Sequence, residues 1–180
     1  MMDHYRRIKR ELALKGKIID FYKDTIIVDD EKEVVFDFIE HKGASAMIPV
    51  DKDGRILMVR QYRNAIDRYT LEIPAGGKNP GEDNLACAIR ECEEETGYRP
   101  HNVKHLIDVH TTVAFSNELI KIYYSTDLTP SKQNLDEDEF MDVKRCTMDE
   151  LVSMIYSGEI TDAKTIAGLL AYKEKIEQAK

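Results

Sequence analysis

One stretch of the chain constrains its fold more than any other: residues 76–98 carry glycine, glutamate and arginine at fixed spacing. The pattern is G-x5-E-x7-R-E-U-x-E-E-x-G-U, where U is an apolar position and x is any residue. Its fixed residues are Gly76, Glu82, Arg90, Glu91, Glu94, Glu95 and Gly97, and Cys92 and Tyr98 hold the two apolar positions. Because residues 85–96 contain neither glycine nor proline, the pattern predicts a short helix there.

The ends and faces of this helix can be derived from the residues. Asp83 or Asn84 can cap its start, and Gly97 stands where a left-handed residue would end it. Helical periodicity predicts one packing stripe. Its members are Leu85, Ala88, Ile89, Cys92 and Thr96.

Glu91, Glu94 and Glu95 point to a neighbouring side of the same helix, where their charges repel one another unless a cation lies among them. Hard carboxylate oxygens favour Mg²⁺ or Mn²⁺ over zinc. A solvated acidic face is the alternative for these three residues taken alone. The other fixed residues, all in register with them, favour a metal site.

Length and charge suggest one enzyme domain with a small N-terminal addition. The 180 residues carry a net charge of −8 and no basic stretch, which argues against nucleic acid or an anionic membrane as a partner. Three cysteines without CxxC spacing, and no signal peptide, indicate a reducing cytoplasm. No apolar run approaches membrane length.

The rest of the chain is read mostly as strands. A polar start, helical or irregular, is expected before a hairpin of residues 17–22 and 25–28 and a strand at 33–41, which would make a small N-terminal antiparallel sheet. Further strands are expected at 44–50, 55–62, 69–75, 103–111, 118–126 and 139–146. The acidic stretch 129–138 is expected to be a loop. Helices are expected from Thr147, in a capping box with Glu150, and from about Asp162 to the end.

The pattern at residues 76–98 resembles the Nudix box, the metal and pyrophosphate site of the Nudix hydrolases. Other segments resemble the ADP-ribose pyrophosphatases of that family, namely residues 40–44, 59–63, 71–76, 139–143 and 158–165. The resemblance implies an α/β (α+β) chain with the Nudix fold, an α/β/α sandwich around a mixed sheet. It also implies an N-terminal β region at 1–42 that forms a homodimer, and a hydrolase domain at 43–180.

The resemblance implies the roles of the box residues as well. Divalent ions would be held by the carbonyl of Ala75 and the carboxylates of Glu91, Glu94 and Glu95. Structural roles in the box fall to Gly76, Glu82, Arg90 and Gly97, with Glu82 and Arg90 as an ion pair.

A glutamate ahead of the late strand would take or orient the proton of the attacking water. Glu139 matches it best, with Glu137 and Asp138 as close alternatives and Glu94 as another candidate within the box.

Substrate contacts are implied at six positions. Arg63 would contact the diphosphate, Phe36 and Asp37 the adenine, and His41 the phosphates. Gly77 and Thr112 complete the set. Taken alone, Arg63 could instead be a surface ion-pair partner, Phe36 an ordinary core residue and His41 a structural histidine.

The function expected from the resemblance is metal-dependent hydrolysis of a nucleoside diphosphate sugar, most directly ADP-ribose to AMP and ribose 5-phosphate. One segment departs from the family pattern: residues 112–115 read Thr-Val-Ala-Phe where ADP-ribose hydrolases commonly carry Ser-Pro-Gly-Phe. The missing proline and glycine change the backbone freedom of this loop. Hydrolysis of another nucleotide sugar or a dinucleotide is therefore the alternative. A sensor that binds ADP-ribose without cleaving it is less favoured, because all box carboxylates are kept.

Overall fold

The structure is a computed structural model that describes residues 4–17, 19–135 and 139–178. The chain divides into two compact units. The smaller contains residues 1–43 and 110–119, and the larger contains residues 44–109 and 120–180.

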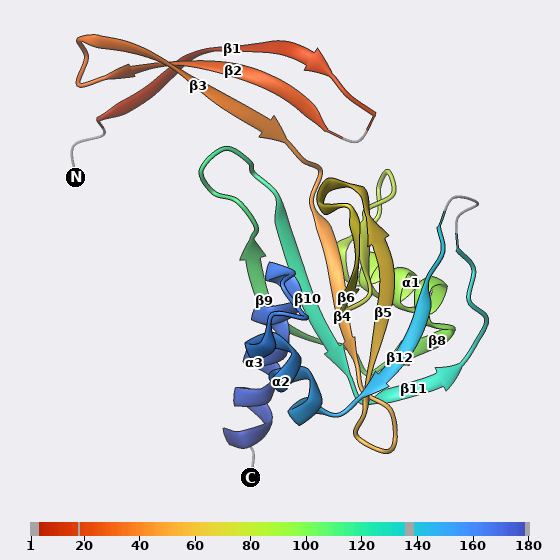
Figure 1. Ribbon diagram of the computed structural model, residues 1–180. Helices are drawn as coiled ribbons and strands as arrows, with labels where there is room; N and C mark the ends of the chain where they lie inside the picture. Colours follow the sequence, from red (N-terminus) through yellow and green to blue (C-terminus); the bar gives the residue numbers. More distant parts are fainter. Residues whose placement is uncertain (1–3, 18, 136–138, 179–180) are drawn as a thin grey trace. The chain divides into compact units, whose positions relative to one another are not determined.

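The smaller unit is built on an antiparallel sheet of β1 (Tyr5–Lys15), β2 (Asp20–Val28) and β3 (Lys32–Glu40), in that order (Figure 1). The expected sheet is present, but the helical or irregular start is wrong, because residues 5–15 pair with β2. The expected hairpin is also wrong, since residues 20–22 and 25–28 lie on one continuous strand, β2. Asp24, which lies between the two expected segments, is 6% exposed and accepts two hydrogen bonds from Arg10 at 2.7 and 2.6 Å.

Three sheets make up the larger unit. The four-stranded sheet has the order β7 (Ala75–Gly77), β4 (Ala44–Pro49), β10 (Leu119–Ser125) and β9 (Lys104–His110). It is mixed, because β4 pairs parallel with β10 and antiparallel with β7. An antiparallel sheet has the order β12 (Asp142–Cys146), β5 (Ile56–Arg63) and β6 (Arg68–Glu72), with a 3₁₀ turn η1 (Asn64–Ile66) between β5 and β6.

The third sheet pairs β8 (Tyr98–His101) with β11 (Asp127–Pro130). Neither strand was expected. Residues 129 and 130, which were expected to begin a loop, are therefore part of a paired strand. Their strand, β11, pairs with β8, which directly follows the box helix.

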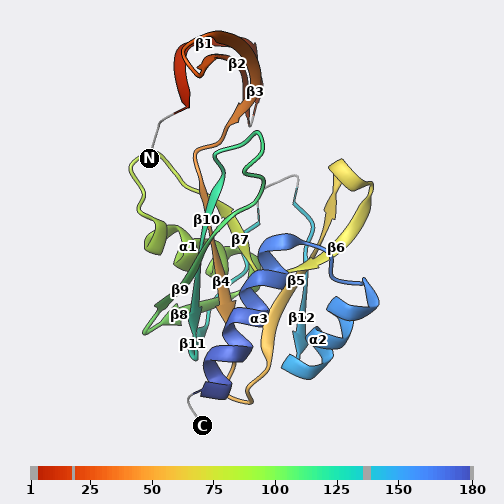
Figure 2. The same ribbon diagram turned by 90° about the vertical axis from the view of Figure 1, so that its left-hand side faces the viewer.

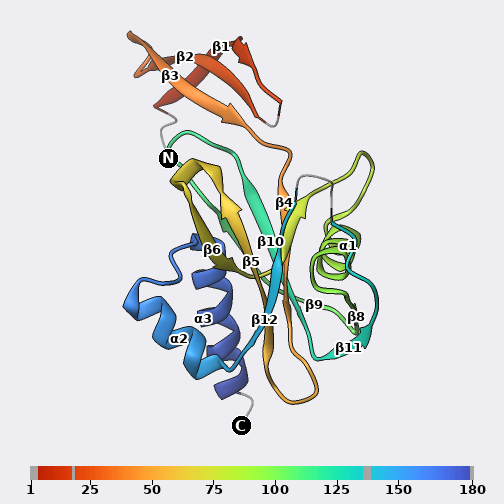
Figure 3. The ribbon, with the colours of Figure 1, turned by 45° about the vertical axis from the view of Figure 1, so that its right-hand side comes forward.

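Helices cover both faces of the mixed sheet. α1 (Asn84–Thr96) lies on one face, and α2 (Met148–Ser157) and α3 (Ala163–Gln178) lie on the other (Figures 2 and 3). β4 shows why: Ala46 and Ile48 belong to the core that includes Leu169 of α3, while Met47 packs with Ala88 of α1. Alternate side chains of a strand point to opposite faces, so both faces are buried. The predicted α/β/α sandwich is confirmed.

The ends of α1 follow the local signals, whereas its buried face does not. Asp83 caps the helix by accepting from the amide of Ala86 at 2.8 Å, and Gly97 ends it at φ 72°. Leu85, expected in the packing stripe, is 41% exposed, while Cys87 is fully buried. The helix also packs against β7, and this turns its buried face toward Cys87.

Among the described residues, none of the helices is both long enough and apolar enough to cross a lipid bilayer.

Candidate active site

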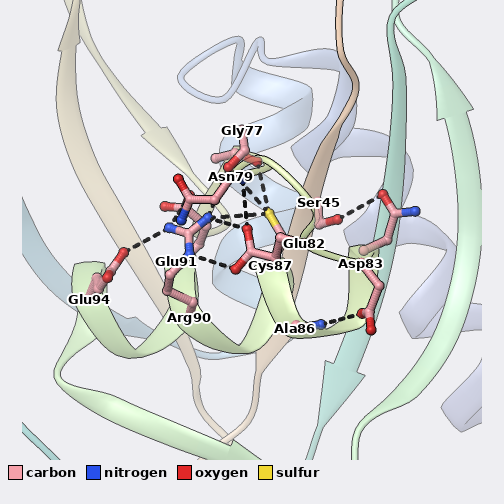
Figure 4. Close-up of polar contacts among 12 residues, drawn as sticks. Ser45, Gly77, Asn79, Glu82, Asp83, Ala86, Cys87, Arg90, Glu91 and Glu94 are labelled. Atoms are coloured by element: carbon pink, nitrogen blue, oxygen red, sulfur yellow. Dashed lines mark hydrogen bonds and ion pairs between the residues drawn. The ribbon is translucent and has the colours of Figure 1, made fainter.

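Arg90 lies at the centre of the polar contacts around the box (Figure 4). Its Nε and Nη2 atoms donate to the two carboxylate oxygens of Glu82, each at 2.8 Å. Its Nη1 donates to Glu91 at 2.7 Å and to Glu94 at 2.9 Å, and Nη2 also reaches the carbonyl of Gly77 at 2.9 Å. One guanidinium therefore joins the loop before α1, the end of β7 and the helix itself.

Glu82 fixes the loop that leads from β7 to α1. The hydrogen bonds from Arg90 lower the pKa of Glu82 to about 2, so the carboxylate is ionised at neutral pH. The same carboxylate accepts from the amide of Asn79 at 2.9 Å. Glu82 and Arg90 thus form the ion pair that the resemblance implied.

Gly76 passes very close to the carboxylate of Glu91. A Cβ atom on Gly76 would lie 2.2 Å from Cδ of Glu91 and 2.3 and 2.4 Å from its two oxygens. Any side chain at position 76 would clash with this carboxylate. Because the residue is a glycine, β7 can run directly beside it. Burial raises the pKa of Glu91 above its ordinary value, although the hydrogen bond from Arg90 opposes the change.

Glu95 is the most deeply buried carboxylate of the box. It is 3% exposed, and its Oε2 accepts from the amide of Ala75 at 3.0 Å. Burial, and then the negative charge of Glu91, raise the pKa of Glu95 to about 8, and the charge of Glu139 adds to the effect. Carboxyl groups are therefore crowded beside β7, and neighbouring carboxylates raise the pKa values of both Glu91 and Glu95.

Glu139 is exposed and lies close enough to raise the pKa values of both Glu91 and Glu95. The structure therefore brings the candidate base from the late segment to the box carboxylates. The two alternatives, Glu137 and Asp138, lie outside the described residues.

Segment 131–134, which precedes Glu139 in the chain, is fastened to the C-terminal end of α1. The amide of Asn134 donates to the carbonyl of Glu94 at 2.9 Å, and the side chain of Gln133 donates to the carbonyl of Glu95 at 2.8 Å. The last carbonyls of a helix have no partner within it, so such contacts satisfy them. Nothing in the polar sequence of this segment indicated that role.

Arg63 is held by a buried carboxylate. Its Nε and Nη2 atoms donate to Glu72 at 2.7 and 2.6 Å, while its own side chain stays 41% exposed. The ammonium of Lys164 contacts the same carboxylate from the start of α3. Arg63 therefore does form an ion pair, as the alternative for this residue stated, but its partner Glu72 is almost fully buried and not on the surface. Sequence reasoning assigned no role to Glu72 or Lys164, because the burial of both side chains depends on the packing of α3.

Of the other candidate substrate residues, Gly77 lies in the larger unit, and Phe36, Asp37, His41 and Thr112 lie in the smaller one. Phe36 is 43% exposed and Asp37 is exposed, so Phe36 is not the core residue that strand alternation allowed. Nδ1 of His41 accepts from the amide of Gly43 at 3.0 Å, and Nε2 lies 3.5 Å from Glu118. The carbonyl of Thr112 accepts from the amides of two later residues of its loop, at 3.3 and 3.0 Å.

No three His, Cys, Asp or Glu side chains within the described ranges are already arranged to hold a metal ion. The candidate ligands make protein contacts instead: Glu91 and Glu94 bond to Arg90, and Glu95 bonds to the amide of Ala75.

Comparison with known proteins assigns the family. A profile of the NUDIX domain matches residues 40–169. The chain belongs to the Nudix family. This Nudix hydrolase is 33% identical over 179 residues to the ADP-ribose pyrophosphatase of Bacillus subtilis (strain 168), with 97% of each chain covered. It is 35% identical over 164 residues to the methanol dehydrogenase activator of Bacillus methanolicus, covering 89% of this chain and 88% of the relative.

The fold is shared with a solved structure of low sequence identity. A crystal structure of an ADP compounds hydrolase matches this Nudix hydrolase with a TM-score of 0.88 at 17% identity, over 99% of this chain and 97% of the other. The predicted family and the pyrophosphohydrolase class are confirmed.

Proposed function

We propose that this Nudix hydrolase cleaves ADP-ribose to AMP and ribose 5-phosphate. The observation that carries the proposal is the placement of two box carboxylates at β7, where Glu91 lies against Gly76 and Glu95 accepts from the amide of Ala75. These carboxylates stand in a chain that aligns along 97% of its length with an ADP-ribose pyrophosphatase.

Magnesium is the proposed cofactor, with manganese as the other option. The carbonyl of Ala75 and the carboxylates of Glu91, Glu94 and Glu95 would hold it, and such hard oxygen donors suit these ions. Two features of the chain support the fit. Glycine at position 76 leaves room for the Glu91 carboxylate, and a cation would offset the burial and the neighbouring charge of Glu91 that raise the pKa of Glu95. When bound, the metal neutralises diphosphate charge and lowers the pKa of water.

The side chains of the chain itself position the reactants. Glu139, or Glu94 within the box, takes or orients the proton of the attacking water. Arg63 approaches the diphosphate while Glu72 holds its guanidinium. The water adds to one phosphorus, and the bond from that phosphorus to the bridging oxygen breaks. Catalysis then rests on positioning and electrostatics and needs no covalent protein intermediate.

The N-terminal region, residues 1–42, is proposed to form a homodimer through β1, β2 and β3. Large apolar side chains are exposed on this sheet, namely Tyr5, Ile8, Leu12, Leu14, Val35 and Phe36. Within it, Phe36 and Asp37 would bind the adenine and His41 would approach the phosphates; Gly77 and Thr112 are the remaining proposed contacts. Light scattering of the full chain tests this assembly, and a monomeric mass at micromolar concentration would contradict it.

Three free cysteines agree with a cytoplasmic location.

A second candidate function follows from the loop at residues 112–115. Because it lacks the proline and glycine of the usual ADP-ribose pattern, another nucleotide sugar or a dinucleotide is the alternative substrate. An ADP-ribose sensor is the third possibility.

The deciding experiment is product analysis with Mg²⁺ on ADP-ribose, NADH, UDP-glucose, GDP-mannose and diadenosine polyphosphates, with Glu95→Gln as the control. Fastest cleavage of ADP-ribose, abolished in the variant, is the expected result. Faster cleavage of another compound would move the function to that substrate. Binding of ADP-ribose without cleavage of any compound would favour the sensor.

A further inference from the structure

The first turn of α3 packs against the segment that leads from β6 into β7. Lys164 and Thr165 are consecutive in α3, and they face two consecutive residues of that segment, Glu72 at the end of β6 and Ile73 directly after it. Lys164 is 6% exposed, and the other three residues are at most 1% exposed. Polar groups buried this deeply depend on partners within the protein, so each of these contacts matters to the residues that it joins.

Lys164 contacts the carboxylate that holds Arg63. Its ammonium meets Oε2 of Glu72, the oxygen that also accepts from Nη2 of Arg63 at 2.6 Å, while Oε1 accepts from Nε of Arg63 at 2.7 Å. Without the ammonium, the buried carboxylate would lose a cationic partner and would gain by turning toward solvent. That movement would break the parallel hydrogen bonds to Arg63. The position of the guanidinium therefore depends on Lys164.

Thr165 fastens the backbone that follows this carboxylate. Its hydroxyl oxygen accepts from the amide of Ile73 at 3.0 Å. Two residues later, the amide of Ala75 donates to Glu95 at 3.0 Å. The backbone from residue 73 to residue 75 is therefore held by α3 at one end and by α1 at the other. These two contacts limit the directions that the Ala75 carbonyl, a proposed metal ligand, can take.

Asp162 and Gly168 keep the start of α3 in this place. Oδ2 of Asp162 accepts from Nζ of Lys164 at 2.9 Å and from the amide of Thr165 at 3.0 Å, so it holds both residues. Gly168 lies further along the same helix, and a Cβ atom there would lie 3.4 Å from Cδ1 of Ile73. Because the residue is a glycine, the helix can lie this close to the segment before β7.

We propose that Lys164 and Thr165 are positioning residues for two different parts of the reaction site. Lys164 aligns Arg63 through the carboxylate that they share, and so sets the affinity for the diphosphate. Thr165 aligns the carbonyl of Ala75 through the backbone that leads to it, and so sets the affinity for the metal. The inference rests on the proposed function and deepens it, because it assigns substrate binding and metal binding to two neighbouring side chains of α3.

The first test is Lys164→Met, which keeps a long side chain and removes its charge. KM for ADP-ribose should rise about tenfold while kcat changes less than about twofold, because an interaction made equally in the bound substrate and in the transition state affects KM alone. The affinity for Mg²⁺ should stay within about twofold of wild type. Lys173→Met is the matched control, because Lys173 lies on the same helix and pairs with Glu177 at 3.4 Å instead.

Two results would overturn the role of Lys164: an unchanged KM, or a loss of Mg²⁺ affinity as large as the rise in KM. Should the methionine variant fail to fold, Lys164→Gln takes its place. Its amide can still donate to Glu72 but carries no charge, so KM should rise about threefold. An unchanged KM in a folded glutamine variant would count equally against the proposal.

The second test compares Thr165→Val with Thr165→Ser. Valine keeps the shape of threonine but leaves the buried amide of Ile73 without its acceptor, whereas serine keeps the hydroxyl and loses only the methyl group. Calorimetric titration with Mg²⁺ should give about tenfold weaker affinity for the valine variant and an affinity within about threefold of wild type for the serine variant. At saturating Mg²⁺, KM for ADP-ribose should rise less than about twofold in both.

A role in packing alone would give the opposite order, because valine preserves the packing of the methyl group and serine does not. Wild-type affinity for Mg²⁺ in Thr165→Val, or a weaker affinity in Thr165→Ser than in Thr165→Val, would therefore overturn the role of Thr165.

Failure of this inference and failure of the proposed function give different results. If the wild type does not hydrolyse ADP-ribose, the proposed function fails. The dissociation constant of ADP-ribose then replaces KM in the first test, and the Mg²⁺ titrations need no substrate. If the wild type hydrolyses ADP-ribose but neither Lys164→Met nor Thr165→Val shows its expected change, the proposed function stands and the inference fails.

Discussion

Glu72 accepts two parallel hydrogen bonds from Arg63, at 2.7 and 2.6 Å, with a side chain that is only 2% exposed. Lys164 contacts the same carboxylate from the first turn of α3, and the hydroxyl of Thr70 donates to it at 2.5 Å. One buried charge therefore connects α3 to β6 and fixes the arginine that is proposed to meet the diphosphate.

Replacing Glu72 with glutamine should destabilise the fold strongly. The substitution keeps the shape but removes one of the two carboxylates beside the buried ammonium of Lys164, Asp162 being the other, and the carboxylate that holds Arg63; breaking such a buried ion pair typically costs about 3–5 kcal/mol. Urea unfolding measures the change in free energy of unfolding. Glu150→Gln serves as the comparison, because Glu150 is an exposed capping residue whose loss should cost about 1 kcal/mol or less. Equal losses in the two variants would contradict the argument.

The free energy of unfolding should decrease as the pH is lowered through the range between the unfolded and folded pKa values of Glu72. Burial alone would raise the pKa of Glu72, but the hydrogen bonds from Arg63 and the charge of Lys164 outweigh it and lower the pKa from 4.5 to about 2. A lowered folded-state pKa means that the stabilisation is complete above about pH 4.5 and is lost as pH falls toward 2. Its size is on the order of 3 kcal/mol. The difference in unfolding free energy between wild type and Glu72→Gln should therefore shrink across this window, and a constant difference would refute the assignment.

Gly76→Ala should weaken binding of Mg²⁺. The new methyl group would lie 2.2 Å from the Glu91 carboxyl carbon, so that carboxylate or β7 must move. Gly77→Ala is the matched control, because a Cβ atom there meets nothing within 4 Å. Isothermal titration with Mg²⁺ should give at least about a tenfold weaker affinity for the first variant and little change for the second. Similar affinities in both variants would show that the close approach is unimportant.

Glu95→Gln should abolish hydrolysis and also the stabilisation by metal. Removing this buried carboxylate takes away a proposed ligand, so activity should fall by at least about a hundredfold. The variant should unfold at a higher temperature than wild type at pH 7 without metal, because a carboxyl group whose pKa burial raises to about 8 costs stability at that pH and glutamine does not, and Mg²⁺ should no longer raise that temperature. Glu93→Gln is the control, since Glu93 lies on the same helix and bonds to Arg99 and Ser131 instead. A thermal shift with Mg²⁺ that survives in Glu95→Gln would exclude Glu95 as a ligand.

The sequence alone determined the box helix and its chemistry. Asp83 and Gly97 set the ends of α1 through contacts within a few residues, and the spacing of Glu91, Glu94 and Glu95 follows from helical geometry. Such signals are readable because each depends only on near neighbours in the chain. The layered fold followed from the family resemblance that these residues carry.

Tertiary packing decided which face of α1 is buried and which carboxylates are enclosed. Leu85 is exposed and Cys87 buried because β7 packs beside the helix, and periodicity cannot foresee where a neighbouring strand will lie. The polar segment at residues 5–15 became β1 because β2 offered it hydrogen-bonding partners.

The arrangement around Glu72 has the same origin. Glu72 and Lys164 are 92 positions apart in the chain, and only the docking of α3 against β6 brings them together. Local preferences determine helices, caps and turns, whereas the burial of a charge depends on partners that the folded chain supplies from a distance.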